Sequence, residues 1–227
     1  MIIFGKQPVL YAIERHSDMI ERLFVAKELD KKLFAKLKSA KKPIEVLDFK
    51  KAQAFARGQN HQGMLAKISP LLFRENREAY DARFAAMCAG VTDAGNLGAI
   101  TRTAYALGVD ALVFGGVSSV NLETLIRASS GAALSTPLFL APNALETIEL
   151  FRQKGFVAIA AASDGEDARA FKCDAPKKLL ILGAEGYGLS ERILKKSDRK
   201  IAIAMEREFD SLNVSAAAAI LIDRIRG

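Results

Sequence analysis

The spacing of apolar residues divides this chain of 227 residues into two parts with different patterns. Over residues 1–69, apolar positions recur at helical spacing in some segments and in short alternating runs in others, which predicts a small α/β module. The expected helices cover 5–15, 30–40 and 48–58, and the expected strands cover 20–26, 44–47 and 64–68. Asp30 and Asp48 are each placed to cap the helix that follows.

From residue 84 onward, short apolar runs alternate with helical patterns. The expected strands cover 85–92, 109–114, 136–140, 156–161, 178–182 and 199–205, and the expected helices cover 97–107, 122–128, 143–154, 190–196 and 213–225. This alternation is typical of a parallel sheet with helices on both faces, in which ligands bind beyond the carboxyl ends of the strands. Residues 70–83 are charged and have no clear period. We therefore expect a linker there, between domains at 1–69 and 84–227.

The net charge of +7 is unevenly distributed along the chain. Residues 1–69 contain 14 Lys and Arg against seven Asp and Glu, whereas residues 70–227 contain 19 of each kind. Positive charge gathered in one module is typical of proteins that bind a polyanion. A lysine-rich solvated surface has the same composition, so charge alone leaves nucleic-acid binding open.

Composition makes several protein classes improbable. The chain has no run of 18 apolar residues and does not begin with a basic region followed by an apolar one, so we expect neither a membrane span nor a secretory signal. Cys88 and Cys173 are far apart, and there are only two histidines. This pattern favours a reducing cytoplasm and argues against a disulfide framework or a Cys/His metal site.

Three polar motifs each follow a predicted strand. The first runs from Val91 to Ala104, where Asp93 and Asn96 can turn and cap the chain and Arg102 lies in the second turn of the helix. The small residues Gly98 and Ala99 would let a ligand or another backbone approach the start of this helix. Taken alone, the same pattern fits an ordinary capped turn with a surface arginine.

The second motif is a glycine-rich loop, with glycines at 183, 186 and 188 after an apolar run. Its GxxGxG spacing differs from the dinucleotide fingerprint and from the P-loop, so it does not predict a pyrophosphate site. Such a loop lets backbone groups reach a flat ligand such as adenine, but many glycine-rich loops are only turns.

The third motif follows Ile203-Ala-Met with a polar loop over 206–210, and then Ser211-Leu-Asn-Val-Ser and four alanines. Either Ser211 or Asn213 can cap the last helix. The alanines at 216–219 permit close helix packing, against the sheet or against a second chain.

Together these motifs resemble those of the SpoU class of the SPOUT RNA methyltransferases, which methylate a ribose 2′-hydroxyl. Their order, spacing and residue types match over residues 84–227. Residues 1–69 are similar to the ribosomal-protein-like RNA-binding domain that often precedes this catalytic domain, including the sequence His61-Gln-Gly. The arrangement most resembles bacterial enzymes that methylate a guanosine of 23S ribosomal RNA.

The resemblance implies an α/β catalytic domain whose C-terminal segment forms a deep trefoil knot, with S-adenosyl-L-methionine (AdoMet) bound in the knot. It also implies a homodimer through this region, with structured RNA held across both chains. Matched residue by residue, the cofactor contacts fall on Gly183, Ile203 and Leu212. The active-site positions of the family fall on Asn96, Arg102, Glu185, Ser211 and Asn213.

The chain departs from the usual pattern of the SpoU class at two positions near the cofactor, since Ala94 and Ala204 stand where proline is common. Lost prolines loosen a chain, which affects affinity rather than chemistry. The loop at 206–210 is also unusually acidic, and it would lie beside either the sulfonium or the RNA entrance.

The residue chemistry suggests roles for this set. Arginine is protonated at neutral pH, so Arg102 would bind the neighbouring phosphate and stabilise the developing alkoxide rather than act as an ordinary base. The proton would go to the phosphate or to a transiently deprotonated Arg102. Asn213 and Ser211 would orient the ribose or the cofactor carboxylate, and Asn96 would brace the first loop. Glu185 would pair with Arg102 or complement the sulfonium.

The basic module would contact RNA phosphates and make its affinity salt-dependent. The lysines assigned to this task are Lys27, Lys31, Lys32, Lys36, Lys38, Lys41 and Lys42. Two rival hypotheses stay open: 2′-O-methylation of transfer RNA, and a nonenzymatic RNA-binding or ribosome-assembly factor. A nucleotide-dependent dehydrogenase is more distant, because its glycine fingerprint is absent.

Overall fold

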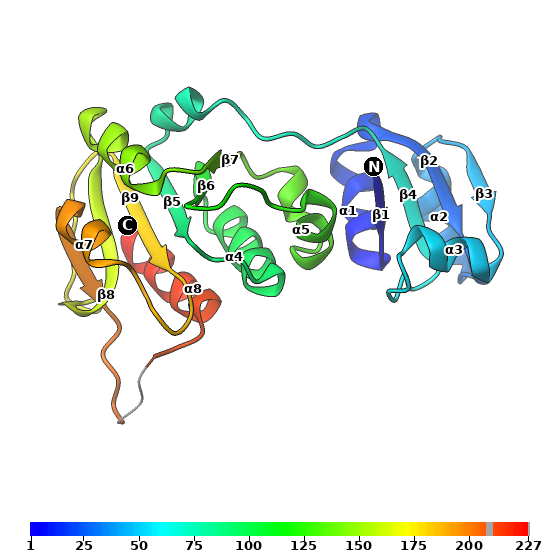
Figure 1. Ribbon diagram of the computed structural model, residues 1–227. Helices are drawn as coiled ribbons and strands as arrows, with labels where there is room; N and C mark the ends of the chain where they lie inside the picture. Colours follow the sequence, from blue (N-terminus) through cyan, green and yellow to red (C-terminus); the bar gives the residue numbers. More distant parts are fainter. Residues whose placement is uncertain (208–210, 227) are drawn as a thin grey trace. The chain divides into compact units, whose positions relative to one another are not determined.

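The structure is a computed structural model that describes residues 1–207 and 211–226 (Figure 1). It forms two compact units. The first contains residues 1–72 and 121–135, and the second contains residues 73–120 and the chain from 136 onward. Each unit has its own sheet, and each is described separately below.

The first unit is a mixed four-stranded sheet in the order β1-β4-β2-β3, packed with helices. Its strands are β1 (Ile2–Phe4), β2 (Ile20–Val25), β3 (Ile44–Val46) and β4 (Met64–Ile68). Its helices are α1 (Lys6–Arg15), α2 (Lys31–Ser39), α3 (Phe49–Phe55) and α5 (Leu122–Ala128), with short 3-10 turns η1 (Ser17–Met19) and η3 (Ala132–Leu134). β4 runs antiparallel to β1 and β2, whereas β2 and β3 are parallel.

The caps predicted for this unit are confirmed. The Asp30 carboxylate accepts from the backbone N–H of Leu33 at 2.8 Å, and the Asp48 carboxylate accepts from that of Lys51 at 2.8 Å. Each bond satisfies a backbone donor that the first turn of the helix leaves free. The pattern did not predict the short strand β1, because three residues are too few to show an alternation.

The second unit is a six-stranded parallel sheet in the order β10-β8-β9-β5-β6-β7. Its strands are β5 (Phe84–Ala89), β6 (Ala111–Gly115), β7 (Leu138–Ala141), β8 (Val157–Asp167), β9 (Lys178–Gly183) and β10 (Arg199–Ala202). Its helices are α4 (Ala94–Ala106), α6 (Ala144–Gln153), α7 (Glu191–Lys196) and α8 (Val214–Ile225), with the 3-10 turn η2 (Asn76–Asp81). This confirms the predicted α/β class and the parallel sheet.

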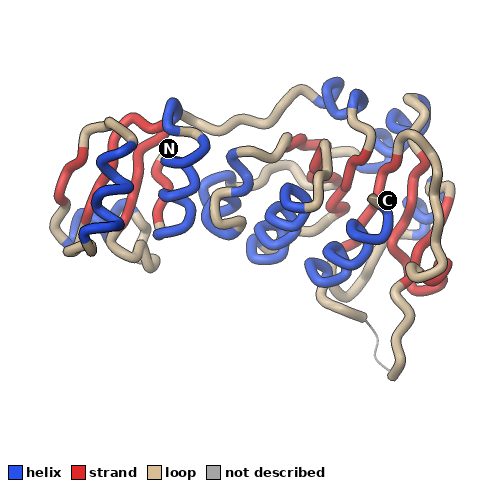
Figure 2. Tube along the Cα trace, turned by 180° about the vertical axis from the view of Figure 1, so that it is seen from behind, coloured by secondary structure: helices blue, strands red, loops and turns tan. Residues whose placement is uncertain are grey.

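Helices cover both faces of this sheet, which explains why every residue of β5 is buried. Ile148 and Phe151 of α6 and Ile193 of α7 pack in one core with alternate strand residues. α4 and α8 pack against each other on the opposite face (Figures 1 and 2). The buried Ala218 of α8 supports the expected close packing of this alanine-rich helix.

Several predicted strand ends were wrong, including that of the strand expected over 85–92, which ends at Ala89. The strand expected over 199–205 ends at Ala202, and the strand expected over 156–161 continues to Asp167. The reason is an interruption between β10 and β8: Lys200 pairs with Ala160, but the next residue, Ile201, pairs with Glu166. The intervening residues 161–165 leave the ladder, and pairing resumes beyond them.

No helix in the part of the chain that the structure describes is long and apolar enough to cross a membrane. Residues 1–207 and 211–226 also contain no group of three His, Cys, Asp or Glu side chains that could hold a metal ion. The trefoil knot and the domain limits at 1–69, 70–83 and 84–227 stay predictions.

Candidate active site

A cavity of about 690 Å³ lies in the second unit. Residues from four stretches line it: 161–167 in β8, 182–189 after β9, 201–205 after β10, and 211–221 leading into α8. Three of these stretches follow or end a parallel strand, where ligands of α/β sheets bind. The volume is in the range of small-molecule sites.

The loop that leaves β9 forms one wall of this cavity. An antiparallel bridge joins Ala184 to Gly188, whose N–H donates to the Ala184 carbonyl at 3.0 Å. A Cβ atom at Gly183 would lie 2.6 Å from the Gly188 carbonyl oxygen and 2.7 Å from the Leu189 nitrogen. Glycine is therefore required at 183 for the loop to fold back this closely.

A second close approach occurs on the opposite wall. A Cβ atom at Gly165 would lie 2.6 Å from the backbone nitrogen of Ile201. Gly165, in the segment displaced from the sheet ladder, therefore packs directly on the backbone of β10, two residues before Ile203. Sequence reasoning missed this wall, because Ala161-Ala-Ser-Asp-Gly matches no motif and only its run of small residues distinguishes it.

The three residues predicted to contact the cofactor all line the cavity. Gly183 lies at the end of β9, Ile203 directly follows β10, and Leu212 precedes α8. Ser211 lines the same cavity. The side chain of Leu212 is 36% exposed and that of Met205 is 40% exposed, so both present apolar surface there.

Asn213 connects three of the predicted motifs. Its amide nitrogen donates to the Asn96 side-chain oxygen at 2.9 Å and also to the carboxylate of Glu185. Its own amide oxygen accepts from the N–H of Ser215 at 2.9 Å and so caps α8. Of the two capping residues considered, Asn213 has the role and Ser211 does not.

Asn96 is fixed from the other side. It is buried in the first turn of α4, and its backbone N–H donates to the Asp93 carboxylate at 2.8 Å, which caps that helix. The bridge from Asn96 through Asn213 therefore connects the N-terminal ends of α4 and α8. Both helix ends are thus tied to Glu185, a cavity residue.

Three carboxylates of the described residues line the cavity, but their partners differ. Asp164 pairs with Lys200 at 2.6 Å and Asp167 pairs with Arg169 at 2.8 Å, and hydrogen bonds from these cations lower the pKa of each carboxyl. Among the described residues, Glu185 makes no ion pair, and its carboxylate accepts from an uncharged amide. Glu185 is therefore the wall carboxylate whose charge is free to face a cationic ligand.

Arg102 is exposed on α4 and makes no hydrogen bond or ion pair within residues 1–207 and 211–226. The pairing considered between Arg102 and Glu185 is not formed, since the carboxylate binds Asn213 instead. An unpaired guanidinium keeps its fork of donors available for a phosphate. Residues 208–210 of the acidic loop lie outside the described residues.

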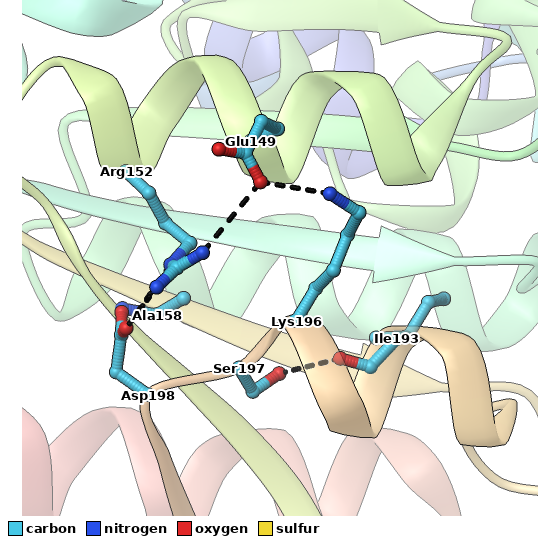
Figure 3. A network of polar contacts seen from close by, with 7 residues as sticks. All are labelled: Glu149, Arg152, Ala158, Ile193, Lys196, Ser197 and Asp198. Atoms are coloured by element: carbon cyan, nitrogen blue, oxygen red, sulfur yellow. Dashed lines mark hydrogen bonds and ion pairs between the residues drawn. The ribbon is translucent and has the colours of Figure 1, made fainter.

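A polar network joins α6 and α7 to the segment that leads into β10 (Figure 3). The Asp198 carboxylate accepts from the Ala158 N–H at 2.8 Å and pairs with Arg152 at 2.8 Å. Glu149 pairs with Lys196 at 2.7 Å. The hydrogen bond from Lys196, together with its charge, lowers the pKa of the Glu149 carboxyl. The network joins α6 to α7 and to the start of β10, so it fixes the strand from which Ile203 follows.

The first unit presents a basic surface on and around α2. Lys31, Lys32 and Lys38 are exposed, and within the described residues none of them forms an ion pair. Lys36 differs, since it pairs with Glu14 at 2.8 Å. Unpaired surface lysines suit contacts with a phosphate backbone.

Comparisons with known proteins match both parts of the chain. Residues 83–223 match the SpoU rRNA Methylase family, and residues 2–73 match the family described as RNA 2′-O ribose methyltransferase substrate binding. A protein of Salmonella typhimurium named 23S rRNA (guanosine-2′-O-)-methyltransferase RlmB is 29% identical over 97% of this chain and 96% of its own length. A putative TrmH family tRNA/rRNA methyltransferase of Staphylococcus aureus is 33% identical over 71% of this chain and 68% of its own length.

Solved structures show the same fold. The SpoU methyltransferase AviRb from Streptomyces viridochromogenes, in complex with AdoMet, has a TM-score of 0.77 at 22% identity, covering 99% of this chain and 88% of that one. An AdoMet-bound rRNA methyltransferase from Sinorhizobium meliloti has a TM-score of 0.76 at 24% identity, covering 98% of this chain and 85% of that one.

Proposed function

This chain belongs to the SpoU rRNA methylase family, and we propose that it methylates the ribose 2′-hydroxyl of a guanosine in 23S ribosomal RNA. Membership makes it an AdoMet-dependent RNA 2′-O-methyltransferase with an RNA-binding module. The choice of ribosomal RNA and of guanosine is supported by the 29% identity to the Salmonella enzyme over nearly the full chain.

The cavity fits AdoMet in shape and charge. Its volume of about 690 Å³ suits a ligand of this size, and Gly183 provides a backbone cradle that a Cβ atom would fill. Apolar surface from Leu212 and Met205 suits the adenine and the thioether chain. Glu185, the wall carboxylate without a cation, complements the sulfonium. This carboxylate in the glycine-cradled cavity is the observation that carries the proposal.

Bound AdoMet supplies a strongly activated methyl group, so the protein's task is to position the ribose and to manage one proton. Arg102 binds the phosphate next to the target ribose and stabilises the alkoxide as it develops. The proton passes to that phosphate or to a transiently deprotonated Arg102. Asn213 and Ser211 orient the ribose or the cofactor carboxylate, and Asn96 holds Asn213 in place.

The two modules have different roles in RNA binding and methyl transfer. Residues 1–69 bind RNA, residues 70–83 connect, and residues 84–227 bind AdoMet and carry out transfer. Two copies assemble through the knotted C-terminal region in the cytoplasm, with RNA held across both chains. The exposed, unpaired Arg102 is consistent with a site that RNA completes.

The test is methyl transfer followed by alkaline digestion. Purified protein is incubated with methyl-labelled AdoMet and unmodified ribosomal or transfer RNA. A 2′-O-methyl group blocks cleavage at the adjacent 3′ phosphate, so label in an alkali-resistant dinucleotide of ribosomal RNA is the expected result. Label in mononucleotides would assign a base as the target, and label in transfer RNA alone would overturn the ribosomal substrate.

A further inference from the structure

One aromatic side chain on the cavity wall has no structural role in the folded chain. Tyr187 is 97% exposed, although it lines the cavity through the loop after β9. Among the described residues that line the cavity, it is the only aromatic one. A large ring held in water at a ligand site contributes nothing to the core, so its value must lie in what it contacts from outside.

The loop presents this ring in a defined way. Tyr187 stands between Gly186 at φ 82° and Gly188 at φ 62°, both in the left-handed region that glycine adopts without strain. The bridge between Ala184 and Gly188 closes the turn that contains Tyr187. The tyrosine is thus carried at the tip of a short, hydrogen-bonded turn rather than on a long loop.

The reaction places a nucleobase close to this rim. Transfer needs the 2′-oxygen about 3–3.5 Å from the methyl group, which is held inside the cavity. The base of the target nucleotide is attached to the ribose carbon next to the one that bears this oxygen. It must therefore lie at the mouth of the cavity, wherever the rest of the RNA runs.

We propose that Tyr187 stacks on the base of the target nucleotide and so positions its ribose for methyl transfer. This inference rests on the proposed function, since it requires an RNA ribose at the cavity. Aromatic rings hold unpaired bases of RNA in this way, and the contact tolerates any base because each has a flat π face.

Two other occupants fit the position less well. The cofactor lies inside the cavity, whereas a ring that is 97% exposed stands in solvent at the rim and is not packed among the other wall residues. A second copy of the chain would need a continuous apolar surface, yet the exposed neighbours of Tyr187 are Glu185, Gly186, Gly188 and Ser190. A single aromatic ring among small and polar residues suits one stacked base.

The test compares Tyr187→Ala with Tyr187→Phe, which keeps the ring and removes only the hydroxyl. The alanine variant should lower kcat/KM for RNA by about 5- to 150-fold, the range that corresponds to loss of one stacked base. The phenylalanine variant should stay near the wild type. In both variants the Kd for AdoMet and the oligomeric state should be unchanged.

A second RNA substrate, which lacks the target base, tests whether Tyr187 contacts that base. Once the missing band in a partial alkaline-hydrolysis ladder has located the methylated nucleotide, an RNA fragment is made with that nucleotide abasic. The penalty of Tyr187→Ala should then vanish, as a double-mutant cycle requires for two groups in contact. The same penalty on both fragments, or an unchanged kcat/KM in the alanine variant, would overturn the proposal. A weakened AdoMet Kd would assign the ring to the cofactor, and dissociation of the oligomer would assign it to a second copy; either result overturns base stacking. Wild-type protein without transfer would instead refute the function itself.

Discussion

The side-chain amide of Asn213 donates a hydrogen bond to the carboxylate of Glu185 while the same residue caps α8. The Asn213 side chain thus has two separable roles. Its amide oxygen caps α8, and its amide nitrogen donates to Glu185 on the cavity wall. The capping duty needs only a short acceptor, whereas the bridge to Glu185 and Asn96 needs an amide donor.

Two substitutions at this position separate the duties. Asn213→Ser keeps a good cap and loses the donor, so stability should stay near the wild type while methyl transfer slows about tenfold or more. Asn213→Ala should slow transfer equally and also lose about 1 kcal/mol of unfolding free energy. Urea unfolding and single-turnover transfer measure the two effects. Wild-type turnover in the serine variant would show that the bridge has no part in the reaction.

Arg102→Lys tests the role of the guanidinium. The charge remains but the planar fork is lost, so transfer should fall about 100-fold while the Kd for AdoMet is unchanged. The exposed side chain makes no polar contact with the described residues, so the fold should not respond. Near-wild-type turnover in this variant would refute the assignment of phosphate and alkoxide binding to Arg102.

Gly183→Ala tests the backbone cradle. The added Cβ meets backbone at 2.6 Å, so the loop after β9 must shift, with a loss of about 1–3 kcal/mol of stability and weaker AdoMet binding. Gly155→Ala is the control. An added Cβ at Gly155 would have no heavy atom within 4 Å, although the backbone there has φ 85°, and Gly155 does not line the cavity. This variant should lose stability through backbone strain and keep its AdoMet affinity. Equal affinity in the two variants would remove Gly183 from the cofactor site.

Lysines of the first unit should govern the salt dependence of RNA binding. Replacing Lys31, Lys32 and Lys38 with glutamine should reduce the slope of log affinity against log salt by about 2, and leave AdoMet binding intact. Lys154, Lys172 and Arg192 in the second unit are exposed and form no ion pair within the described residues, so their replacement with glutamine provides the control triple. An equal loss of slope in both triples would point to a general charge effect rather than a binding surface.

The two cysteines should differ sharply in reactivity. Cys88 is fully buried in β5, and burial raises the pKa of its thiol to about 12, so almost no thiolate forms near about pH 8. Cys173 is partly exposed. A thiol reagent should therefore label one site quickly and the other only on unfolding. Cys173→Ser should abolish the fast phase, and rapid labelling that survives this change would contradict the packing of β5.

The periodic pattern predicted the succession of strands and helices along the chain and the parallel sheet, because the central strands of that sheet are apolar runs such as β5 and β9. It failed at β8, where the ladder is interrupted and resumes. The interruption depends on the close packing of Gly165 against Ile201, two residues far apart in the sequence, and no local pattern records such a contact.

Some features of the candidate site were also predictable from the sequence, and others were not. Gly183, Ile203, Ser211 and Leu212 were predicted from motifs, and the structure brings them to one cavity. The partner of Glu185 was not predictable, because an arginine and an asparagine were both available and only the fold decides which lies within reach. Tyr187 was overlooked, since within a glycine-rich motif its exposure cannot be seen from the sequence.

The walls of the cavity all come from residues 161–221, the last part of the described chain to be synthesised. The first unit is complete once residue 135 has been made, whereas the cavity cannot close until residue 221 is in place. A nascent chain therefore passes through a stage at which its basic module can fold while it has no cofactor affinity. AdoMet binding therefore requires that the chain has been made as far as residue 221 and that the second unit has folded, so a shorter nascent chain is unable to modify the RNA that it touches.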